Sequence, residues 1–228
     1  MKMVAQWTAF FRFIKKPHFL QEENKVISKL KITFSLFILQ IILVGLTTLV
    51  ISLILIHYFG LKSDSANENL QLLYNPVILF AMVAVLEEFS FRGFLKKFNP
   101  LFFSISVAGI SGIYFKKLYY RNMVFELQGL MEMGILMIFI FTLSLFFAKK
   151  NTSKMTAFWD SNQHSIIISS AVLFAFIHFF NHKNLDLVNL PLIISQFLSA
   201  FILSFVRMRS GLVFAILLHF IWDLLLGF

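Results

Sequence analysis

Seven apolar runs, separated by short polar or basic stretches, constrain this chain more than any other feature. The first, Ile32–Phe59, is ample for one membrane crossing, because about 20 apolar residues span a bilayer. Charged residues make up 14% of the 228 residues, against roughly 25% in soluble domains. The sequence therefore predicts an all-α, polytopic transmembrane bundle of about seven or eight helices. The later runs are Pro76–Phe98, Leu101–Phe115, Met131–Ala148, Ile166–Phe180, Leu190–Val206 and Leu212–Phe228.

The N-terminal segment 1–31 differs from the rest, because it is basic and interleaved with aromatic residues. Trp7, Phe10, Phe11 and Ile14 recur at helical spacing, which predicts a short interfacial helix lying on the membrane face. A plain N-terminal tail is the alternative. Residues 32–228 are predicted to form the transmembrane helical domain.

The basic residues between the runs predict the topology, because cytoplasmic loops are enriched in Lys and Arg. A cytoplasmic N-terminus places Lys96 and Lys97, Lys149–Lys154, and Arg207 with Arg209 inside. The loops Leu61–Asn69 and Asn181–Asn189, which carry little positive charge, then fall outside. The net charge of +9 indicates topology and anionic lipid headgroups, and no nucleic-acid partner is expected. Small size and a composition rich in Phe, Ile, Lys and Asn favour a bacterial cell membrane, with the bilayer as the main partner.

The third run is the exception to this alternation. Lys116–Arg121 follows it and lands outside with three basic residues. Leu101–Phe115 is short and contains Gly109 and Gly112, so it is either kinked or re-entrant, or the rule fails at this loop. If the run does not cross, every later assignment reverses, including the side of the C-terminus.

Two adjacent carboxylates and an arginine interrupt the second run. Ionisable groups inside a membrane span are costly and are usually retained for a function. Glu88 and Arg92 stand at i, i+4 with the acid on the N-terminal side, the favourable order for an ion pair. Glu87 sits about 100° further round the helix, so its carboxylate is left for other partners. The trio is either a salt bridge that fixes helix packing, or a supported base, Glu87, that faces other helices.

Ionisable residues are also few in the later runs. His178 lies late in the fifth run, and His219 and Asp223 share one face of the seventh at i, i+4. Each of them alone has a structural explanation, such as a histidine at a helix interface. Together with Glu87 they come from three separate helices with hardly any other partners. We therefore expect the four to meet in one intramembrane polar cavity.

Such a cavity suits hydrolysis. A buried carboxylate can take a proton from water, a histidine can position that water, and a second polar pair can stabilise an oxyanion. Glu87, His178, His219 and Asp223 also form an N₂O₂ set compatible with zinc, so a metal site stays open. The zinc-protease pattern H-E-x-x-H is absent, because Phe179 follows His178, and the chain has no Cys. No cofactor is predicted, and less than stoichiometric zinc is expected.

Three short motifs resemble the signatures of the CAAX-protease and bacteriocin-processing family of intramembrane proteases (CPBP), also called the Abi family. They are spread over roughly Asn75–Phe228, in the family's order and on separate apolar runs. Arg207–Leu212 also resembles the small-residue turn that precedes the last motif. The matches are E-E-x-x-x-R at Glu87, Glu88 and Arg92, F-x-x-x-H at Phe174 and His178, and H-x-x-x-N/D at His219 and Asp223.

The resemblance implies an intramembrane endopeptidase acting on a peptide or membrane-protein substrate. Glu87 would activate water with help from His178, and His219 with Asp223 would stabilise the oxyanion. Glu88, Arg92 and Phe174 would be supporting residues. The chain departs from the eukaryotic prenyl proteases in carrying Asp223 where they generally have Asn, and in a long gap between Arg92 and Phe174.

Two other functions fit the same polar residues. A catalytically silent membrane scaffold or bacteriocin-immunity protein can hold a peptide in this cavity. A small proton-coupled carrier can use intramembrane Glu and His groups as a relay. The carrier is the weaker alternative, because no paired inverted repeats are visible in the sequence.

Overall fold

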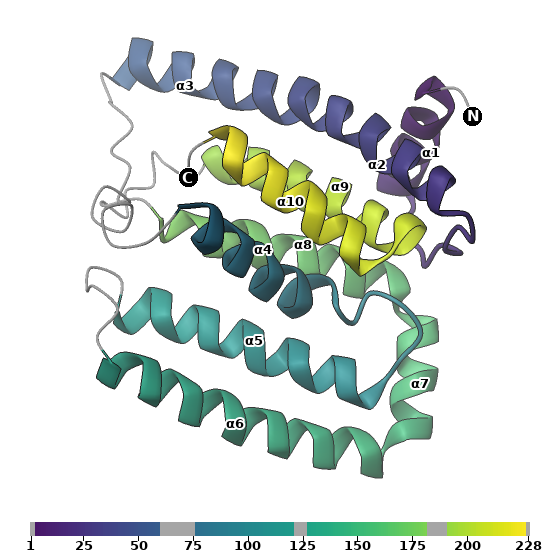
Figure 1. Ribbon diagram of the computed structural model, residues 1–228, viewed down its shortest axis with the longest axis vertical. Helices are drawn as coiled ribbons and strands as arrows, with labels where there is room; N and C mark the ends of the chain where they lie inside the picture. Colours follow the sequence, from purple (N-terminus) through teal and green to yellow (C-terminus); the bar gives the residue numbers. More distant parts are fainter. Residues whose placement is uncertain (1–2, 60–75, 121–126, 182–190, 227–228) are drawn as a thin grey trace.

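The computed structural model describes residues 3–59, 76–120, 127–181 and 191–226, and these contain helices and no strand (Figure 1). The all-α bundle predicted from the apolar runs is confirmed. The predicted loop at 61–69 and most of that at 181–189 lie outside the described residues. The elements are α1 (Met3–Lys15), α2 (Val26–Gln40), the π-helical turn η1 (Ile41–Gly45), α3 (Leu46–Phe59), α4 (Pro76–Arg92), α5 (Pro100–Tyr119), α6 (Leu127–Lys150), α7 (Thr152–Ser161), α8 (Gln163–Phe179), α9 (Leu192–Ser210) and α10 (Leu212–Leu226).

Four helical stretches among the described residues are long and apolar enough to cross a membrane. They are Val26–Tyr58, Pro100–Tyr119, Gln128–Lys150 and Leu192–Ser210. The pair α7 and α8, bent by 86°, makes a fifth if it is counted as one broken span. The sequence predicted seven crossings. The difference lies largely in α4 and α10, which have only 17 and 15 residues and adjoin parts of the chain outside the described ranges.

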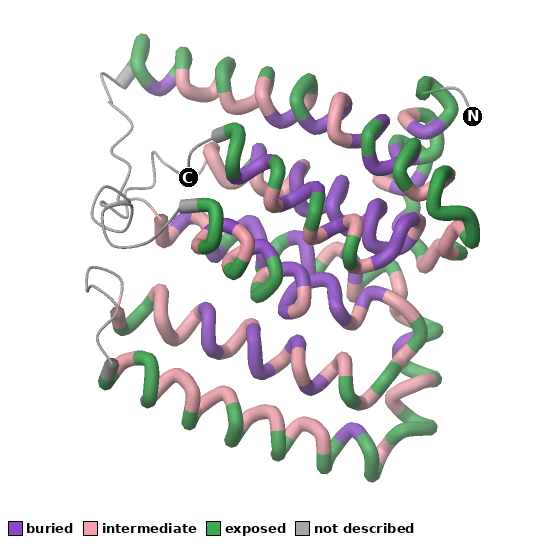
Figure 2. Tube along the Cα trace, in the orientation of Figure 1, coloured by how far each residue is buried: buried purple, intermediate pink, exposed green. Residues whose placement is uncertain are grey.

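The helices form a layered bundle with α9 near its middle. In Figure 1, α5 and α6 form one edge, α3 forms the opposite edge, and α4, α8, α9 and α10 lie between them. Figure 2 shows that buried positions concentrate in this central group, whereas α3 and α6 are largely exposed. The core therefore sits around the helices that carry the three polar motifs of the sequence.

The N-terminal helix α1 packs on this bundle. Phe10 and Phe13 are buried, and both rings contact Phe205 of α9 at centroid distances of 5.7 and 5.4 Å. Trp7 donates a hydrogen bond from its indole Nε1 to the backbone oxygen of Ser35 on α2, at 2.9 Å. The predicted helix is present. Its location at the membrane interface stays a prediction.

The helix that carries the acidic motif begins at Pro76 as predicted, but it ends at Arg92 and not at Lys96 and Lys97. The carbonyls of Arg92 and Gly93 accept hydrogen bonds from Arg207 of α9, and Arg92 O also accepts from Leu95 N. No local pattern predicts partners 115 positions away, whereas the apolar run continues to Phe98.

The third run forms α5, one continuous helix of 20 residues that is long and apolar enough to cross a membrane. Gly109 serves close packing. A side-chain carbon at Gly109 would collide with Ser90 of α4, so glycine is what allows α4 and α5 to approach. Gly211 has the one positive φ, 102°, among the described residues, and forms the turn between α9 and α10.

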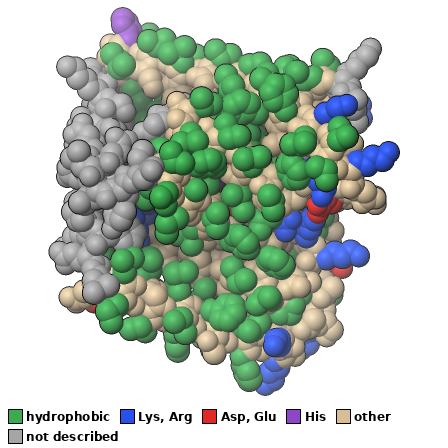
Figure 3. Space-filling model, viewed as in Figure 1, with side chains coloured by type: hydrophobic (Ala, Val, Ile, Leu, Met, Phe, Trp, Pro, Cys, Tyr) green, Lys and Arg blue, Asp and Glu red, His purple; other side chains and the backbone are tan. Residues whose placement is uncertain are grey.

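Basic residues gather at the end of the bundle where α4, α6 and α9 finish (Figure 3). The connector between α1 and α2, residues 16–25, is tied to this end by its two acids. Glu22 accepts hydrogen bonds from Lys29 and Lys96, and Glu23 pairs with Arg209. The connector thus joins the start of α2 to the chain after α4 and to the end of α9.

Candidate active site

Side chains from three other helices anchor the last turns of α4. Because these turns hold both carboxylates and the arginine of the acidic motif, the anchoring fixes where those groups point. The carbonyls of Phe89 and Arg92 also accept backbone hydrogen bonds from Gly93 and Leu95, so the side chains add a second bond there. The donors and acceptors are Ser106 Oγ to Phe89 O at 2.8 Å, Ser170 Oγ to Phe91 O, Arg207 Nε to Arg92 O at 3.0 Å and Arg207 Nη2 to Gly93 O at 3.1 Å.

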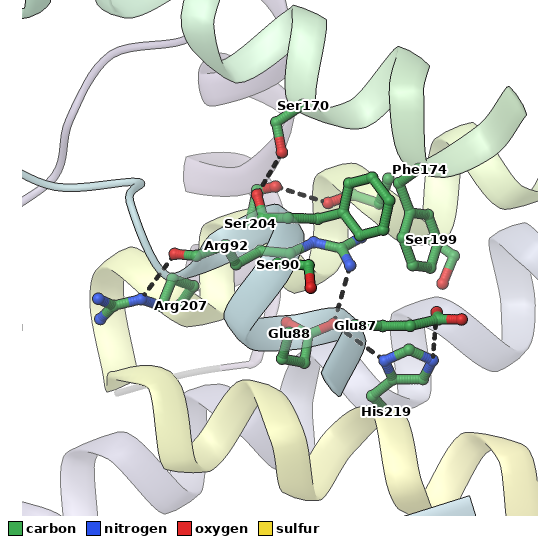
Figure 4. A network of polar contacts seen from close by, with 12 residues as sticks. Glu87, Glu88, Ser90, Arg92, Ser170, Phe174, Ser199, Ser204, Arg207 and His219 are labelled. Atoms are coloured by element: carbon green, nitrogen blue, oxygen red, sulfur yellow. Dashed lines mark hydrogen bonds and ion pairs between the residues drawn. The ribbon is translucent and has the colours of Figure 1, made fainter. Parts of the chain in front are cut away.

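Glu88 is the buried centre of the cluster, with no exposed surface. Its Oε1 accepts one hydrogen bond from Arg92 Nη1 and one from His219 Nδ1, each at 2.9 Å (Figure 4). The ion pair expected from the i, i+4 spacing is therefore present. The bond to His219 was not expected, and it links α4 to α10.

Phe174 of α8 covers the arginine of this pair. The guanidinium carbon of Arg92 lies 3.7 Å from the centre of the Phe174 ring, which is a close cation–π contact. The Nε and Nη2 groups of Arg92 have no hydrogen-bond partner among the described residues. The ring therefore supplies part of the stabilisation that hydrogen bonds leave out, in keeping with the supporting role expected for Phe174.

Glu87 faces the two histidines. Its Oε2 lies 3.9 Å from His178 Nε2 and 3.8 Å from His219 Nε2, distances too long for direct hydrogen bonds. His178 Nδ1 lies 2.8 Å from the backbone oxygen of Phe174, and a carbonyl only accepts, so Nδ1 carries the hydrogen. In the neutral ring, the lone pair of His178 Nε2 is then turned toward Glu87.

Asp223 lies beside His219, with 3.5 Å between its Oδ2 and His219 Nε2. The sequence suggested that Asp223 orients this imidazole from the same helix face. In the structure, Glu88 makes the shorter contact, to Nδ1, and Asp223 faces the opposite nitrogen. His219 is thus held between a buried carboxylate and two others, Glu87 and Asp223.

The cluster has a closed side and a more open side. The Glu88 and Arg92 side chains have no exposed surface and His219 has 5%. Glu87, Asp223 and His178 keep 12%, 13% and 16% of their side-chain surface exposed. Any ligand that reaches the cluster therefore meets Glu87, His178 and Asp223 first, while Glu88 and Arg92 stand behind them.

The zinc alternative stays a prediction. Within the described part of the chain, no group of three or more His, Asp or Glu side chains is arranged to hold a metal ion. His182 stands four positions after His178 and would be a second imidazole one helical turn away. It lies outside the described residues.

Sequence reasoning missed one residue that shapes the site. Arg207 stands near the end of an apolar run, where the sequence indicates a topology signal and the start of a turn that resembles the family's, and neither predicts a contact with α4. In the structure it is buried and donates to two carbonyls at the end of α4. An arginine that shortly precedes a membrane-edge glycine is ordinary, so no local signal separates this role from charge at a membrane surface.

The several helices that are long and apolar enough to cross a membrane indicate an integral membrane protein. Residues 69–225 match the model of a family described as type II CAAX prenyl endopeptidase Rce1-like, and the chain belongs to that family of proteases. The resemblance drawn from the three motifs is confirmed at this level, and the match contains every candidate site residue. No curated protein and no solved structure matches the chain.

Proposed function

We propose that this protein is an intramembrane endopeptidase that hydrolyses a peptide bond with a water molecule activated by Glu87. The observation that carries the proposal is the spacing at Glu87. Its Oε2 has no hydrogen bond to any described residue, yet it lies within 3.9 Å of two imidazole Nε2 atoms. Polar atoms at this separation are suited to share a water molecule.

The chemistry follows from these positions. Glu87 takes one proton from the water as its oxygen bonds to the peptide carbonyl carbon, and His178 Nε2 helps to orient the water. The carbonyl electrons move onto the oxygen to form an oxyanion. When the intermediate collapses, the carbon–nitrogen bond breaks and the proton on Glu87 passes to the leaving amine. The products are a new carboxylate and a new amine.

His219 and Asp223 serve the oxyanion in this scheme. A donor aimed at the developing negative charge is among the largest contributions to acyl-transfer catalysis. The Glu88 contact to Nδ1 at 2.9 Å fixes the ring. Since Nδ1 then donates to Glu88, His219 donates to the oxyanion from Nε2 in its protonated form. Arg92 balances the charge of Glu88, so the pair is a support for the histidine as well as for Glu87.

The setting of this activity belongs to the proposal. We expect the bacterial inner membrane, a cytoplasmic N-terminus, and a substrate that is a peptide or a membrane protein. The family description names a prenyl endopeptidase, so a prenylated peptide is the first substrate to test. The departure at Asp223 counts against the same substrate as that of the eukaryotic prenyl proteases. We also propose that the reaction needs no zinc.

The decisive variant is Glu87→Gln, which keeps the shape of the side chain and removes the base. We expect it to abolish cleavage, by about 100-fold or more, while membrane expression stays near normal. Quantitative proteomics of membranes from wild-type and Glu87→Gln strains would show which peptides lose a cut. Elemental analysis of the same purified proteins, without chelator, should find far less than one zinc per chain.

Glu132→Gln is the matched control, because it makes the same Glu-to-Gln substitution on the largely exposed helix α6. It should leave the cleavage pattern unchanged. Full processing by Glu87→Gln would remove Glu87 from the mechanism and favour a silent scaffold. About one zinc per chain, with activity lost to a chelator and restored by zinc, would show that the four residues are metal ligands.

A further inference from the structure

A second buried polar contact lies outside the acid cluster, between α2 and α9. Gln40 has no exposed surface, although it stands inside the apolar helical stretch Val26–Tyr58. Its Nε2 donates to Ser199 Oγ at 3.1 Å, and its Oε1 has no partner among the described residues. A buried amide inside a membrane span is costly, so its retention calls for an explanation.

The helix is also irregular at this place. Directly after Gln40, residues Ile41–Gly45 form a π-helical turn, in which hydrogen bonds skip one residue more than in an α-helix. Such turns are rare, and inside helices they occur often at functional sites. The chain thus accepts two unfavourable features at one point, a buried amide and a widened turn.

Ser199 connects this point to the site. Its hydroxyl oxygen accepts from Gln40, so the hydroxyl hydrogen remains to be donated elsewhere. In Figure 4 the Ser199 hydroxyl of α9 lies on the side of the Glu87 carboxylate, and no hydrogen bond joins the two side chains in this structure. A carboxylate only accepts hydrogen bonds, which makes it the natural partner of that hydrogen. Gln40 therefore selects the direction in which the serine donates.

We propose that Gln40 and Ser199 are a positioning pair that holds the Glu87 carboxylate in its reactive orientation. Ser199 acts on Glu87 directly, and Gln40 acts through Ser199. The inference rests on the proposed function, since the orientation of Glu87 matters for catalysis only if Glu87 is the base. A fixed base raises the rate of the chemical step, because misplacement of a catalytic group by a small distance is costly.

A simpler alternative is a packing bond between α2 and α9 with no influence on the site. The two ideas differ in what happens at Glu87. Infrared spectra of the full-length protein in lipid, wild type minus Glu87→Gln, isolate the band of the Glu87 carboxyl group. We expect Ser199→Ala and Gln40→Met each to shift that band. Ser195→Ala should not, because Ser195 lies one turn earlier on α9 and its hydroxyl donates to Leu192 O at 2.7 Å.

Kinetics on an internally quenched farnesylated CAAX peptide provide a second readout. If Ser199 donates to Glu87 during the reaction, its loss in Ser199→Ala should lower kcat about 3–10-fold and leave KM unchanged. Gln40→Met should lower kcat by less than Ser199→Ala, and the double variant should be no slower than Ser199→Ala alone. Ser199→Thr, which keeps the hydroxyl, should recover most of the rate.

The two readouts separate the failure of this pair from the failure of the enzyme. A Glu87 band that does not move in Ser199→Ala would overturn the pair and leave a packing bond. Losses that multiply in the double variant would show two independent residues. If Glu87→Gln retained full cleavage, the proposed function would fail, and the infrared band would still decide whether Ser199 contacts Glu87.

Discussion

Helices α6 and α9 have similar length and opposite surroundings. In the apolar stretch of α9, 61% of the residues are buried inside the protein, whereas in the apolar stretch of α6 none is. The buried helix is the more polar of the two. It carries Ser195, Ser199, Ser204, Arg207 and Ser210, all of them buried, and α6 has mainly Ile, Leu, Met and Phe on its exposed faces.

In water-soluble proteins the buried helix is usually the more apolar one, and here the opposite holds. Lipid tails are as apolar as leucine, so burial of apolar surface does not drive helices together, and small or polar side chains mark the helix interfaces. On α9 these side chains hold α2 through Ser199 and α4 through Arg207. On α9, therefore, polar side chains mark the surface that packs against other helices, whereas the exposed faces of α6 are apolar.

The largest effect is expected where the core is most polar. Arg92→Ala leaves Glu88 without its cation in a site with no exposed surface, at a cost of about 3–5 kcal/mol in the free energy of unfolding. Folded yield in detergent and the thermal midpoint should both fall. The double variant Glu88→Gln/Arg92→Met should recover part of the yield. A single variant as abundant and thermostable as wild type would show that the ion pair does not hold α4.

A matched pair of isoleucines tests the comparison itself. Ile202 of α9 has no exposed surface, and Ile138 of α6 is 69% exposed. Ile202→Ala should lower the free energy of unfolding by about 2–3 kcal/mol, since lost packing remains while the water-transfer part is small in lipid. Ile138→Ala should stay within about 0.5 kcal/mol of wild type. Equal losses in the two variants would mean that α6 is covered by a partner.

The smallest effect on stability is expected in the connector, residues 16–25, whose ion pairs are partly exposed to water. Burial raises the pKa of Glu22, but hydrogen bonds from Lys29 and Lys96 outweigh it, and the net shift is downward from the ordinary value of 4.5. A lowered folded-state pKa gives stability that is present above 4.5 and is lost as the pH falls below it.

Glu22→Gln should therefore lower the thermal midpoint modestly at about pH 7 and match wild type at about pH 3. Thermal unfolding in detergent across this range would measure the difference. Asp160→Asn, an exposed acid on α7, is the control and should change neither value. A Glu22→Gln curve parallel to wild type at every pH would show that the lysine contacts add no stability.

The sequence predicted the parts of this structure that have a local cause. The pair Glu88 and Arg92 follows from helical spacing, and the helix start at Pro76 follows from the fixed φ of proline. The motif residues were expected in one cavity because few polar groups were available, and the structure brings Glu87, His178, His219 and Asp223 together.

The rest depended on contacts between distant segments. Glu88 and His219 are 131 positions apart, and Arg207 and Arg92 are 115 apart. No periodicity links such residues, so the partner of His219 was assigned to Asp223, which is near in sequence. For the same reason the end of α4 was placed too late. Sequence rules extend the helix until a residue such as Pro100 ends it. In the structure, Arg207 of α9 binds the carbonyl of Arg92 and the helix ends there.

The ion pair within α4 also bears on how the protein is made. The ribosome releases α4 well before α8, α9 and α10, so the acidic motif enters the bilayer before its later partners exist. Each unpaired charge at the centre of a helix costs about 2.5–3.5 kcal/mol during insertion. Glu88 and Arg92 lie on one helix and can neutralise each other at once, at 2.9 Å. Glu87 gains its imidazoles only when α8 and α10 have followed, so the nascent chain holds no assembled site until its last helix is in place.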